Sequence, residues 1–377
     1  MAERRLGIIA SGGTGRMGRV HHLPALMAIR AEGGLPLSGG DRLVPELLLV
    51  GRDSQRLAEL GRTFGIERYT TDLDQALSDP AYEVFFDSAV THTRPAFLIK
   101  AVRAGKHIYS EKPAVSSADQ GLQLLKDAEA RGLKHGVVED KLHTPGIKAL
   151  RQLRDTEFFG RIIRFHLDFG FWVFDGKQIP CQRPSWNYRS DQDGGIMLDM
   201  FSHWRYLIED LLGRITRLTS SAWTAIPERI DEHGERYRVD VEDSAMCIMT
   251  LENGVRGSIS STWATRAKRD DRLSLHIDGT SGSAEVGYHS CFIQPAAEKA
   301  TADDVKSPGA DRSSPWLEVP VPAETKSSCR AGWEEFLRHV AEGAPLQSDL
   351  KAGIRDVQFG ELCLQSARES RWLSFPP

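Results

Sequence analysis

The sequence lacks any arrangement of cysteines that would mark a disulfide framework or a zinc site. Its five cysteines are odd in number and scattered, and no two stand in a CxxC spacing. Dispersed thiols of this kind are typical of a chain kept in a reducing compartment. The sequence therefore predicts a cytoplasmic protein with no bound metal.

An excess of one charge and long apolar runs are also missing. The formal net charge of −4 and the pI of about 6.3 are too balanced for a nucleic-acid-binding surface or an anionic membrane. No apolar stretch is long enough for a signal peptide or a membrane span. With 40% hydrophobic and 27% charged residues over 377 positions, the composition is that of a soluble globular protein, and two domains are expected.

Glycine is concentrated at one place near the N-terminus. An apolar segment at residues 6–10 is followed by Gly13-x-Gly15-x-x-Gly18 and then by a helical pattern at residues 19–30. In this order the first glycine makes the tight turn, the second lets the backbone approach a diphosphate, and the third lets helix and strand pack closely. The pattern predicts a dinucleotide site formed by Gly13, Thr14, Gly15, Arg16, Met17 and Gly18, with a ligand-free glycine loop as the alternative.

The end of the second strand bears on the choice of coenzyme. Residues 46–50 form this strand, after a Gly- and Pro-rich insertion at residues 32–45 that we expect to be a surface loop. An NAD site usually has an acidic residue after this strand, whereas here Gly51 is followed by Arg52 and Asp53. Arg52 favours the 2′-phosphate of NADP, and the alternative is that Asp53 binds the ribose of NAD.

The first third of the chain alternates between helices and strands, which predicts a parallel, doubly wound sheet. Helices are expected at residues 54–64, 72–77 and 95–104, and a fourth, capped by Ser116 or Ser117, reaches Arg131. The expected strands are 84–86 and 107–110. The last of these strands ends on Glu111-Lys112-Pro113. A lysine at the C-terminal edge of such a sheet lies where coenzyme and substrate meet, a buried lysine can exchange protons near neutrality, and the proline stiffens the turn.

The pattern changes near residue 136, after which successive hairpins predict an antiparallel sheet. Strands are expected at 161–169, 216–224, 244–250, 255–263, 273–277 and 283–286, and helices at 144–154, 332–340 and 350–369. Residues 298–315 are polar and are expected to form an exposed loop. The predicted division is a dinucleotide-binding domain at residues 1–135 and a second, substrate-binding domain at residues 136–377.

Asp199 and His203 stand four residues apart in an apolar helical run, so both side chains share one helix face. An imidazole can take a proton from a substrate hydroxyl near neutral pH, and a carboxylate can orient it. The alternative is a surface pair or a buried structural histidine. Metal binding is disfavoured because no third ligand is apparent.

Polar and aromatic residues near this pair are candidates for binding substrate. Aromatic faces pack on the apolar face of a ligand, while asparagine and arginine bind hydroxyls or an anionic group. The alternative for each arginine is an ordinary ion pair with a nearby aspartate. The candidates are Arg183, Trp186, Asn187, Arg189, Arg205 and Arg266, with Tyr188 as a possible further base.

These motifs together resemble the Gfo/Idh/MocA family of sugar and polyol oxidoreductases. The matching residues are Gly13 to Gly18, Ala104 to Pro113 and Gly194 to His203, in the expected order and over nearly the whole chain. The resemblance implies an N-terminal Rossmann domain and a C-terminal α+β domain with an open antiparallel sheet, which commonly mediates dimers or tetramers. Where many members have a Thr-Pro-Asn turn, this chain has Ala89-Val90-Thr91, and Ser88 and Thr91 remain the candidates for the nicotinamide side, with Glu111 and Lys112 beside them.

The sequence thus predicts an NAD(P)-dependent oxidoreductase that acts on a sugar, polyol or glycoside, anionic if the arginines bind it. His203 removes the hydroxyl proton, Lys112 hydrogen-bonds the developing alkoxide, and Asp199 orients the base. One alternative is an NAD-dependent glycoside hydrolase that oxidises C3 transiently and expels the aglycone by elimination. Another is a non-catalytic NADP-binding regulatory protein.

Overall fold

The computed structural model describes residues 2–170, 183–265, 271–296, 315–321 and 326–376. The chain divides into two compact units. The first is made of Met1–His143 and Thr325–Gln358, and the second of Thr144–Glu324 and Phe359–Pro377. The first unit is therefore completed by a segment from near the C-terminus. The functional division predicted at residue 135 stays a prediction.

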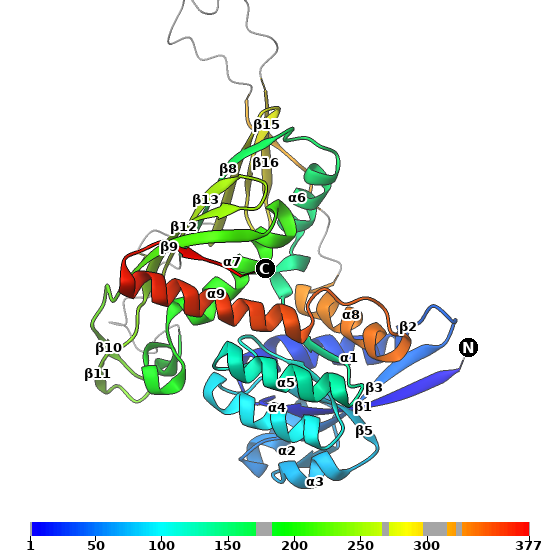
Figure 1. The fold of residues 1–377 in the computed structure, drawn as a ribbon. Helices are drawn as coiled ribbons and strands as arrows, with labels where there is room; N and C mark the ends of the chain where they lie inside the picture. Colours follow the sequence, from blue (N-terminus) through cyan, green and yellow to red (C-terminus); the bar gives the residue numbers. More distant parts are fainter. Residues whose placement is uncertain (1, 171–182, 266–270, 297–314, 322–325, 377) are drawn as a thin grey trace, which may run out of the picture. The chain divides into compact units, whose positions relative to one another are not determined.

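The first unit is built on a mostly parallel sheet (Figure 1). Its strands follow the order β4-β3-β1-β5-β6-β7, which is the strand order of a dinucleotide-binding Rossmann sheet. All of these neighbours are parallel, as predicted, so their carboxyl ends meet at one edge. The strands are β1 (Glu3–Ser11), β3 (Arg42–Val50), β4 (Arg68–Thr70), β5 (Tyr82–Asp87), β6 (His107–Ser110) and β7 (His135–Val137).

Helices cover both faces of this sheet, because its central strand buries side chains on both sides. Leu6, Ile8 and Ala10 of β1 pack against one helical layer, and Ile9 packs against the other. In Figure 1, α1 lies on one side of β1 and α4 and α5 lie on the other. The first layer is α1 (Leu23–Ala31), α2 (Ser54–Phe64) and α8 (Ser328–Glu342); the second is α3 (Leu73–Ser78), α4 (Arg94–Arg103), α5 (Ala118–Ala130) and the start of α9 (Leu350–Glu369).

Helix α8 is fixed to the Rossmann unit by charge as well as by packing. Its Arg330 donates to both carboxylate oxygens of Glu32, which follows α1, at 2.6 and 2.5 Å. A two-pronged guanidinium–carboxylate pair sets orientation as well as distance. The ring of Phe336 stacks on Tyr109 of β6 at 4.4 Å between centroids. Both contacts fix the position of helix α8 against the parallel sheet.

The insertion at residues 32–45 is more regular than predicted. Strand β2 (Leu35–Pro36) pairs antiparallel with the start of β3, which begins at Arg42 rather than near residue 46. Pro45 lies within β3, between the part that pairs with β2 and the part that pairs with β4. One side of β3 is open there, so a residue without an amide hydrogen is tolerated.

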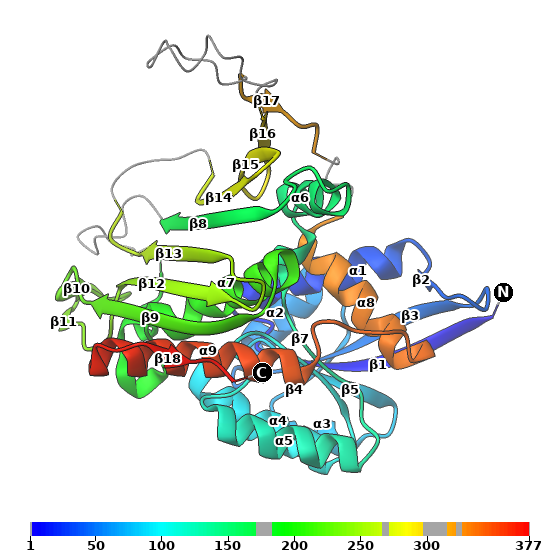
Figure 2. The ribbon, with the colours of Figure 1, turned by 45° about the horizontal axis from the view of Figure 1, so that its top comes forward.

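The second unit contains a nine-stranded sheet in the order β17-β16-β15-β14-β8-β13-β12-β9-β18. Figure 2 shows β8, β13, β12 and β9 side by side. All pairs are antiparallel except β8 with β13, so the predicted open antiparallel sheet is confirmed with one parallel pair. The strands are β8 (Ile162–Gly170), β9 (Ile215–Trp223), β12 (Ser244–Leu251), β13 (Arg256–Thr262), β14 (Leu273–Gly279), β15 (Gly282–Val286), β16 (Cys291–Pro295), β17 (Leu317–Glu318) and β18 (Leu373–Ser374).

Among the described residues, helices cover one face of this second sheet and leave the other face open. Helices α6 (Pro145–Asp155) and α7 (Ile196–Leu212) pack on it, and the inward residues of β12 are buried. The alternating residues Met246 and Ile248 on β12 are 51% and 52% exposed. A separate two-stranded ribbon, β10 (Glu228–Ile230) with β11 (Arg236–Arg238), was not predicted.

Two further observations concern the chain as a whole. Within the described ranges, no helix is long and apolar enough to cross a bilayer. The exposed loop predicted at residues 298–315 lies almost entirely outside the described residues.

Candidate active site

The turn after β1 has the tight backbone expected of a dinucleotide-binding loop, but the left-handed residue is Gly12 and not Gly13. Gly12 has a φ of 74°, and a Cβ atom there would lie 2.3 Å from the amide nitrogen of Ala89. Its carbonyl oxygen accepts a hydrogen bond from the amide of Gly15 at 2.9 Å. The tight turn assigned to the first glycine of the motif therefore falls one residue earlier, on a glycine that the motif does not include.

Gly18 has the packing role predicted for it. A Cβ atom at Gly18 would lie 2.6 Å from the Cα of Gly13 and 2.9 Å from the carbonyl oxygen of Gly12. The chain then enters a π-helical turn, Gly18–His22, which leads into α1. The residues between the glycines, Thr14, Gly15, Arg16 and Met17, are exposed. The turn is thus an open backbone cradle at the carboxyl end of β1, which fits the diphosphate of a dinucleotide.

Arg52 and Asp53 follow β3 at the same edge of the sheet. Arg52 is exposed, while Oδ1 of Asp53 accepts from the amides of Gln55 and Arg56, each at 3.0 Å. Asp53 is therefore the N-cap of α2, and this half of its carboxylate is occupied.

Glu111 is a buried carboxylate in the turn that follows β6. Its Oε1 lies 2.8 Å from Nε2 of His22, and its Oε2 accepts from the amide of Lys112 at 3.1 Å. Burial alone would raise the pKa of Glu111, but the hydrogen bond with His22 and the positive charges of Lys112 and Arg94 lower it to about 2. The carboxylate is therefore ionised throughout the physiological range, directly beside Lys112.

Arg94 holds the other side of the same turn. Its guanidinium donates to the carbonyl oxygen of Pro113 at 2.5 Å, to that of Ala89 at 2.6 Å and to Oδ2 of Asp87 at 3.1 Å. Burial raises the pKa of Asp87, and the charge of Arg94 opposes that effect. Arg94 was not predicted as a site residue; a buried arginine at the start of a helix has no signature in the sequence.

Ser88 and Thr91, the candidates for the nicotinamide side, lie in the segment that follows β5. The hydroxyl and amide of Ser88 both donate to the carbonyl oxygen of Ser11, each at 3.0 Å, which joins the ends of β5 and β1. Thr91 is 4% exposed and begins a short 3₁₀ turn. Lys112 itself is half-buried, and the peptide bond to Pro113 is cis.

In the second unit, α7 carries Asp199 and His203 one turn apart, as predicted. Nδ1 of His203 lies 2.6 Å from the hydroxyl of Tyr206, and His203 is 5% exposed. The carboxylate of Asp199 accepts from both terminal nitrogens of Arg183, one of them at 3.0 Å. The structure thus adds Tyr206, three residues along the helix from His203, and pairs two predicted site residues, Arg183 and Asp199, with each other.

The start of α7 is fixed by a glycine and a buried acid. Gly195 has a φ of 112°, and Oε1 of Glu242 accepts from the amide of Met197 at 3.0 Å. Burial raises the pKa of Glu242. A Cβ atom at Gly195 would lie 2.6 Å from this oxygen, so only glycine fits at this position. The start of α7, and with it the position of Asp199 and His203 along the helix, is therefore fixed by Gly195 and Glu242.

The other substrate candidates have defined partners. Tyr188 is fully buried beneath the guanidinium of Arg229, 4.0 Å from its ring centroid. Arg205 is 5% exposed and pairs with Glu209 at 3.2 Å, and Arg189 lies over the ring of Tyr237 at 4.4 Å. Trp186 is half-buried, Asn187 is buried and donates to the carbonyl of Pro184 at 3.1 Å, and Arg266 lies outside the described residues.

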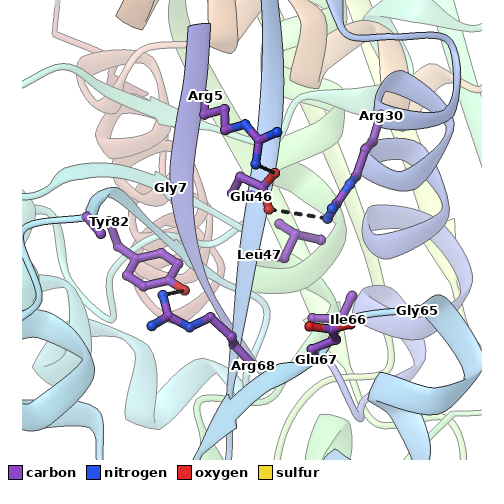
Figure 3. Close-up of a pocket in the computed structure, with 11 residues that line it drawn as sticks. Arg5, Gly7, Arg30, Glu46, Leu47, Gly65, Ile66, Glu67, Arg68 and Tyr82 are labelled. Carbon is purple, nitrogen blue, oxygen red and sulfur yellow. Dashed lines mark hydrogen bonds and ion pairs between the residues drawn. The ribbon is translucent and has the colours of Figure 1, made fainter. Parts of the chain in front are cut away.

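A pocket of about 440 Å³ in the first unit lies away from the glycine turn (Figure 3). It is lined by residues from the amino-terminal halves of β1, β4 and β5 and the middle of β3. Arg5 and Arg30 both approach Glu46 at 3.4 Å, and Arg68 donates to the hydroxyl of Tyr82 at 2.9 Å. These arginines make ordinary ion pairs and hydrogen bonds, and the coenzyme edge is at the opposite ends of the strands. Within the described ranges, no group of three His, Cys, Asp or Glu residues is arranged to hold a metal ion.

Comparison with known proteins agrees with this geometry. Residues 5–138 match the oxidoreductase family with an NAD-binding Rossmann fold, and residues 147–285 match the GFO/IDH/MocA C-terminal domain. The chain is 39% identical to D-xylose dehydrogenase of Paenarthrobacter nicotinovorans, over 98% of this chain and 97% of that protein. It is 24% identical to levoglucosan dehydrogenase of Pseudarthrobacter phenanthrenivorans, over 100% and 99% of the two chains.

The fold also matches solved structures. A levoglucosan dehydrogenase in complex with NADH and levoglucosan superimposes with a TM-score of 0.83 at 21% identity, over 99% of this chain and 100% of that one. The chain belongs to the Gfo/Idh/MocA family of oxidoreductases. It is an NAD(P)-dependent sugar dehydrogenase with an NAD(H)-binding Rossmann domain, and the alternative of a non-catalytic regulatory protein is set aside.

We expect Gly18→Ala to damage the coenzyme turn, because its Cβ would lie within 3 Å of backbone atoms of Gly12 and Gly13. The strain should lower the free energy of unfolding by about 1–3 kcal/mol and weaken NADH binding. Gly39→Ala is the matched control, since nothing lies within 4 Å of its Cβ position. Urea unfolding and NADH fluorescence titration of both variants check this; equal behaviour would contradict it.

We expect Glu111→Gln to lose stability in a pH-dependent way. The folded-state pKa of about 2 lies below the ordinary value of 4.5, so the ionised carboxylate stabilises the fold above pH 4.5, and this contribution is lost as the pH falls toward 2. The variant should be less stable than wild type by on the order of 2–3 kcal/mol at pH 7.

The difference between the two proteins should shrink steadily between pH 4.5 and about 2. Urea unfolding across this range measures it, with the exposed Glu83→Gln as the control. A difference that does not vary with pH would show that the charge of Glu111 is not what stabilises the turn.

Proposed function

We propose that this protein oxidises a small neutral sugar, an aldose such as D-xylose, at a carbinol carbon, with His203 as the base and Lys112 as the cationic hydrogen-bond donor. The observation that carries the proposal is the turn around Lys112. Its backbone is fixed through Glu111 and Pro113 by buried, charge-assisted hydrogen bonds, which is more fixation than a solvated surface lysine needs. The relatives with sugar dehydrogenase names support the substrate class.

The glycine turn would hold the coenzyme diphosphate, and Arg52 and Asp53 would flank the adenosine ribose. When bound, the nicotinamide supplies a hydride acceptor. Arg52 is exposed, and Oδ2 of Asp53, which Nε of Arg56 approaches to 3.6 Å, is not used in the helix cap. Both residues therefore remain candidates for distinguishing the 2′-hydroxyl of NAD from the 2′-phosphate of NADP, and NAD(H) is the coenzyme we propose for turnover.

His203 would take the proton from the sugar hydroxyl through Nε2, because Nδ1 faces the hydroxyl of Tyr206 at 2.6 Å. A hydroxyl at Nδ1 fixes the ring orientation and can accept or donate as the imidazole changes state. Lys112 would donate to the oxygen on which negative charge develops.

Asp199 would act on the site through Arg183 as well as through the helix face it shares with His203. Arg183 binds the Asp199 carboxylate and lies over the ring of Trp263, 4.3 Å from its centroid. Trp186 and Asn187 stand on the same short segment and are the proposed sugar contacts, with Arg266 as a further candidate.

A neutral sugar is favoured over an anionic one by the described arginines. Arg183 is bound to Asp199, Arg205 to Glu209, and Arg189 lies over Tyr237. Guanidinium groups already paired or stacked have less to gain from a carboxylate or sulfonate ligand. The redox-neutral glycoside hydrolase stays a second prediction, because it would use the same Lys112 and His203.

We also propose that the protein is a homodimer or homotetramer that associates through the open face of the second sheet. On that face Met246 and Ile248 are half exposed, and their cross-strand neighbours on β13, Ser260 and Ser258, are small. A flat apolar surface rimmed by small polar residues is typical of an interface between copies. The cytoplasmic location stays a prediction.

We expect Lys112→Met to lower kcat by several orders of magnitude while NADH affinity stays near that of wild type, because the ammonium acts on the developing alkoxide. Steady-state kinetics and NADH fluorescence titration check this. Lys126→Met, at an exposed position on α5, is the matched control. Near-normal turnover of the Lys112 variant would refute its role.

The substrate class is tested by a screen of aldoses, polyols and nitrophenyl glycosides with NAD and with NADP. Absorbance of the reduced coenzyme and release of nitrophenol are followed together. Net reduction with free aldoses supports the dehydrogenase. Aglycone release without net reduction would select the hydrolase.

We expect Ile248→Glu to shift the protein toward monomers, because a charge would be buried at the proposed interface. Light scattering after size exclusion measures the change. Leu122→Glu is the control, because Leu122 is similarly exposed, at 48%, on α5 of the first unit. Identical masses for wild type and the Ile248 variant would argue against this face.

A further inference from the structure

His22 is a fully buried histidine that the proposed chemistry does not use. It is the last residue of the π-helical turn after the glycines, and its exposed fraction is 0%. Both ring nitrogens have close partners within the first unit. Nε2 lies 2.8 Å from Oε1 of Glu111, and Nδ1 accepts from the indole nitrogen of Trp333 at 3.1 Å.

These contacts decide which nitrogen carries the proton. An indole N–H can only donate, so Nδ1 must present a lone pair to Trp333 and carries no hydrogen. The single ring proton is then on Nε2, where it is donated to Glu111.

Cys329 is compatible with the same assignment. Its sulfur lies 3.1 Å from Nδ1 of His22, and the residue is buried on α8, in the same core cluster as Trp333. Burial raises the pKa of the Cys329 thiol, so the sulfur keeps its proton and can donate it to Nδ1 once Trp333 has fixed the tautomer.

The contacts continue from His22 to the reactive lysine. Glu111 takes the Nε2–H proton on Oε1 and the amide of Lys112 on Oε2, while its own amide donates to the carbonyl of Asp87 at 2.8 Å. The carboxylate is therefore oriented from both sides. A rotation of the His22 ring would move the acceptor of the Lys112 amide.

We propose that His22, held in the Nε2–H form by Trp333, is a positioning residue that fixes the Glu111 carboxylate and through it the ammonium of Lys112. This inference rests on the proposed role of Lys112 in the reaction. It assigns a function to helix α8, which brings the indole to the ring from 311 positions further along the chain. It also explains why the glycine turn continues into a π-helical turn, since that turn ends on His22.

Several charged and titratable groups surround these contacts. Glu111, with Lys112 and Arg94 beyond it, faces the ring on the Nε2 side, and Cys329 faces it on the Nδ1 side. Further groups that act electrostatically on this part of the first unit are His21, Tyr109, Asp140, Lys141 and Glu335. Asp140 and Lys141 pair with each other at 2.7 Å.

Two substitutions test the hydrogen bonds from Trp333 to His22 and from His22 to Glu111 separately. Trp333→Phe keeps an aromatic ring but removes the donor to Nδ1, so the His22 ring is no longer held in one tautomer and one orientation. Its kcat should fall by about tenfold, while NADH affinity stays near that of wild type, because the Glu111 carboxylate loses its fixed place beside Lys112.

His22→Leu removes both contacts and should lower kcat by tenfold or more, with KM for NADH changed by less than about threefold. His22→Gln offers an amide donor and a carbonyl acceptor, and should recover part of the loss. Trp372→Phe and His289→Gln, at exposed positions, are the matched controls. Thermal unfolding of each variant separates loss of fold from loss of position.

The tautomer can be read in the wild-type protein by nitrogen-15 NMR of histidine side chains, with the His22→Gln spectrum giving the assignment. We expect the ring proton of His22 on Nε2 and none on Nδ1. A protonated Nδ1 would overturn the inference whatever the variants do. So would wild-type kcat in folded Trp333→Phe and His22→Leu while Lys112→Met is inactive. If Lys112→Met is itself active, the proposed function fails instead.

Discussion

The arrangement of the first unit around its coenzyme edge depends on one buried negative charge, the carboxylate of Glu111. The Glu111 carboxylate is 4% exposed, and an isolated charge at such a depth would be prohibitively costly. It is tolerable only with donors on each oxygen and cations nearby. Those partners come from the turn after β1, from the turn after β6, and from the start of α4. The carboxylate therefore locks together the segments that approach the coenzyme and the segment that presents the lysine.

Much of this unit could be predicted from the sequence, because local signals agreed with the fold. The strand at residues 107–110 and the helix at residues 350–369 have the predicted bounds. The short strands β4 and β7 were missed, since three residues give no readable alternation. The glycine pattern located the coenzyme turn but not its left-handed residue, because two adjacent glycines are equivalent in sequence and only packing against Ala89 distinguishes Gly12.

The partners of the site residues were beyond local reasoning. The i, i+4 spacing correctly placed Asp199 and His203 on one helix face, but nothing local pointed to Arg183 as the partner of Asp199. Tyr206 was within reach, because it stands one turn beyond His203 on the same helix. Arg94 and Trp333 gave no signal, since each acts on a residue distant in sequence. The hairpins of the second unit were read correctly, whereas the parallel pairing of β8 with β13 joins strands that are not neighbours in the chain.

The position of α8 has a consequence for how the protein is made. The Rossmann strands leave the ribosome first, but the helix that fills one side of their core and covers His22 is encoded more than three hundred residues later. Until that helix is synthesised, the nascent sheet exposes apolar surface along β1 and β6 and leaves an imidazole without its indole partner. Competence to hold the lysine in place is therefore conferred late, when the polypeptide is nearly complete, and truncated chains would carry an intact fingerprint motif without a working site.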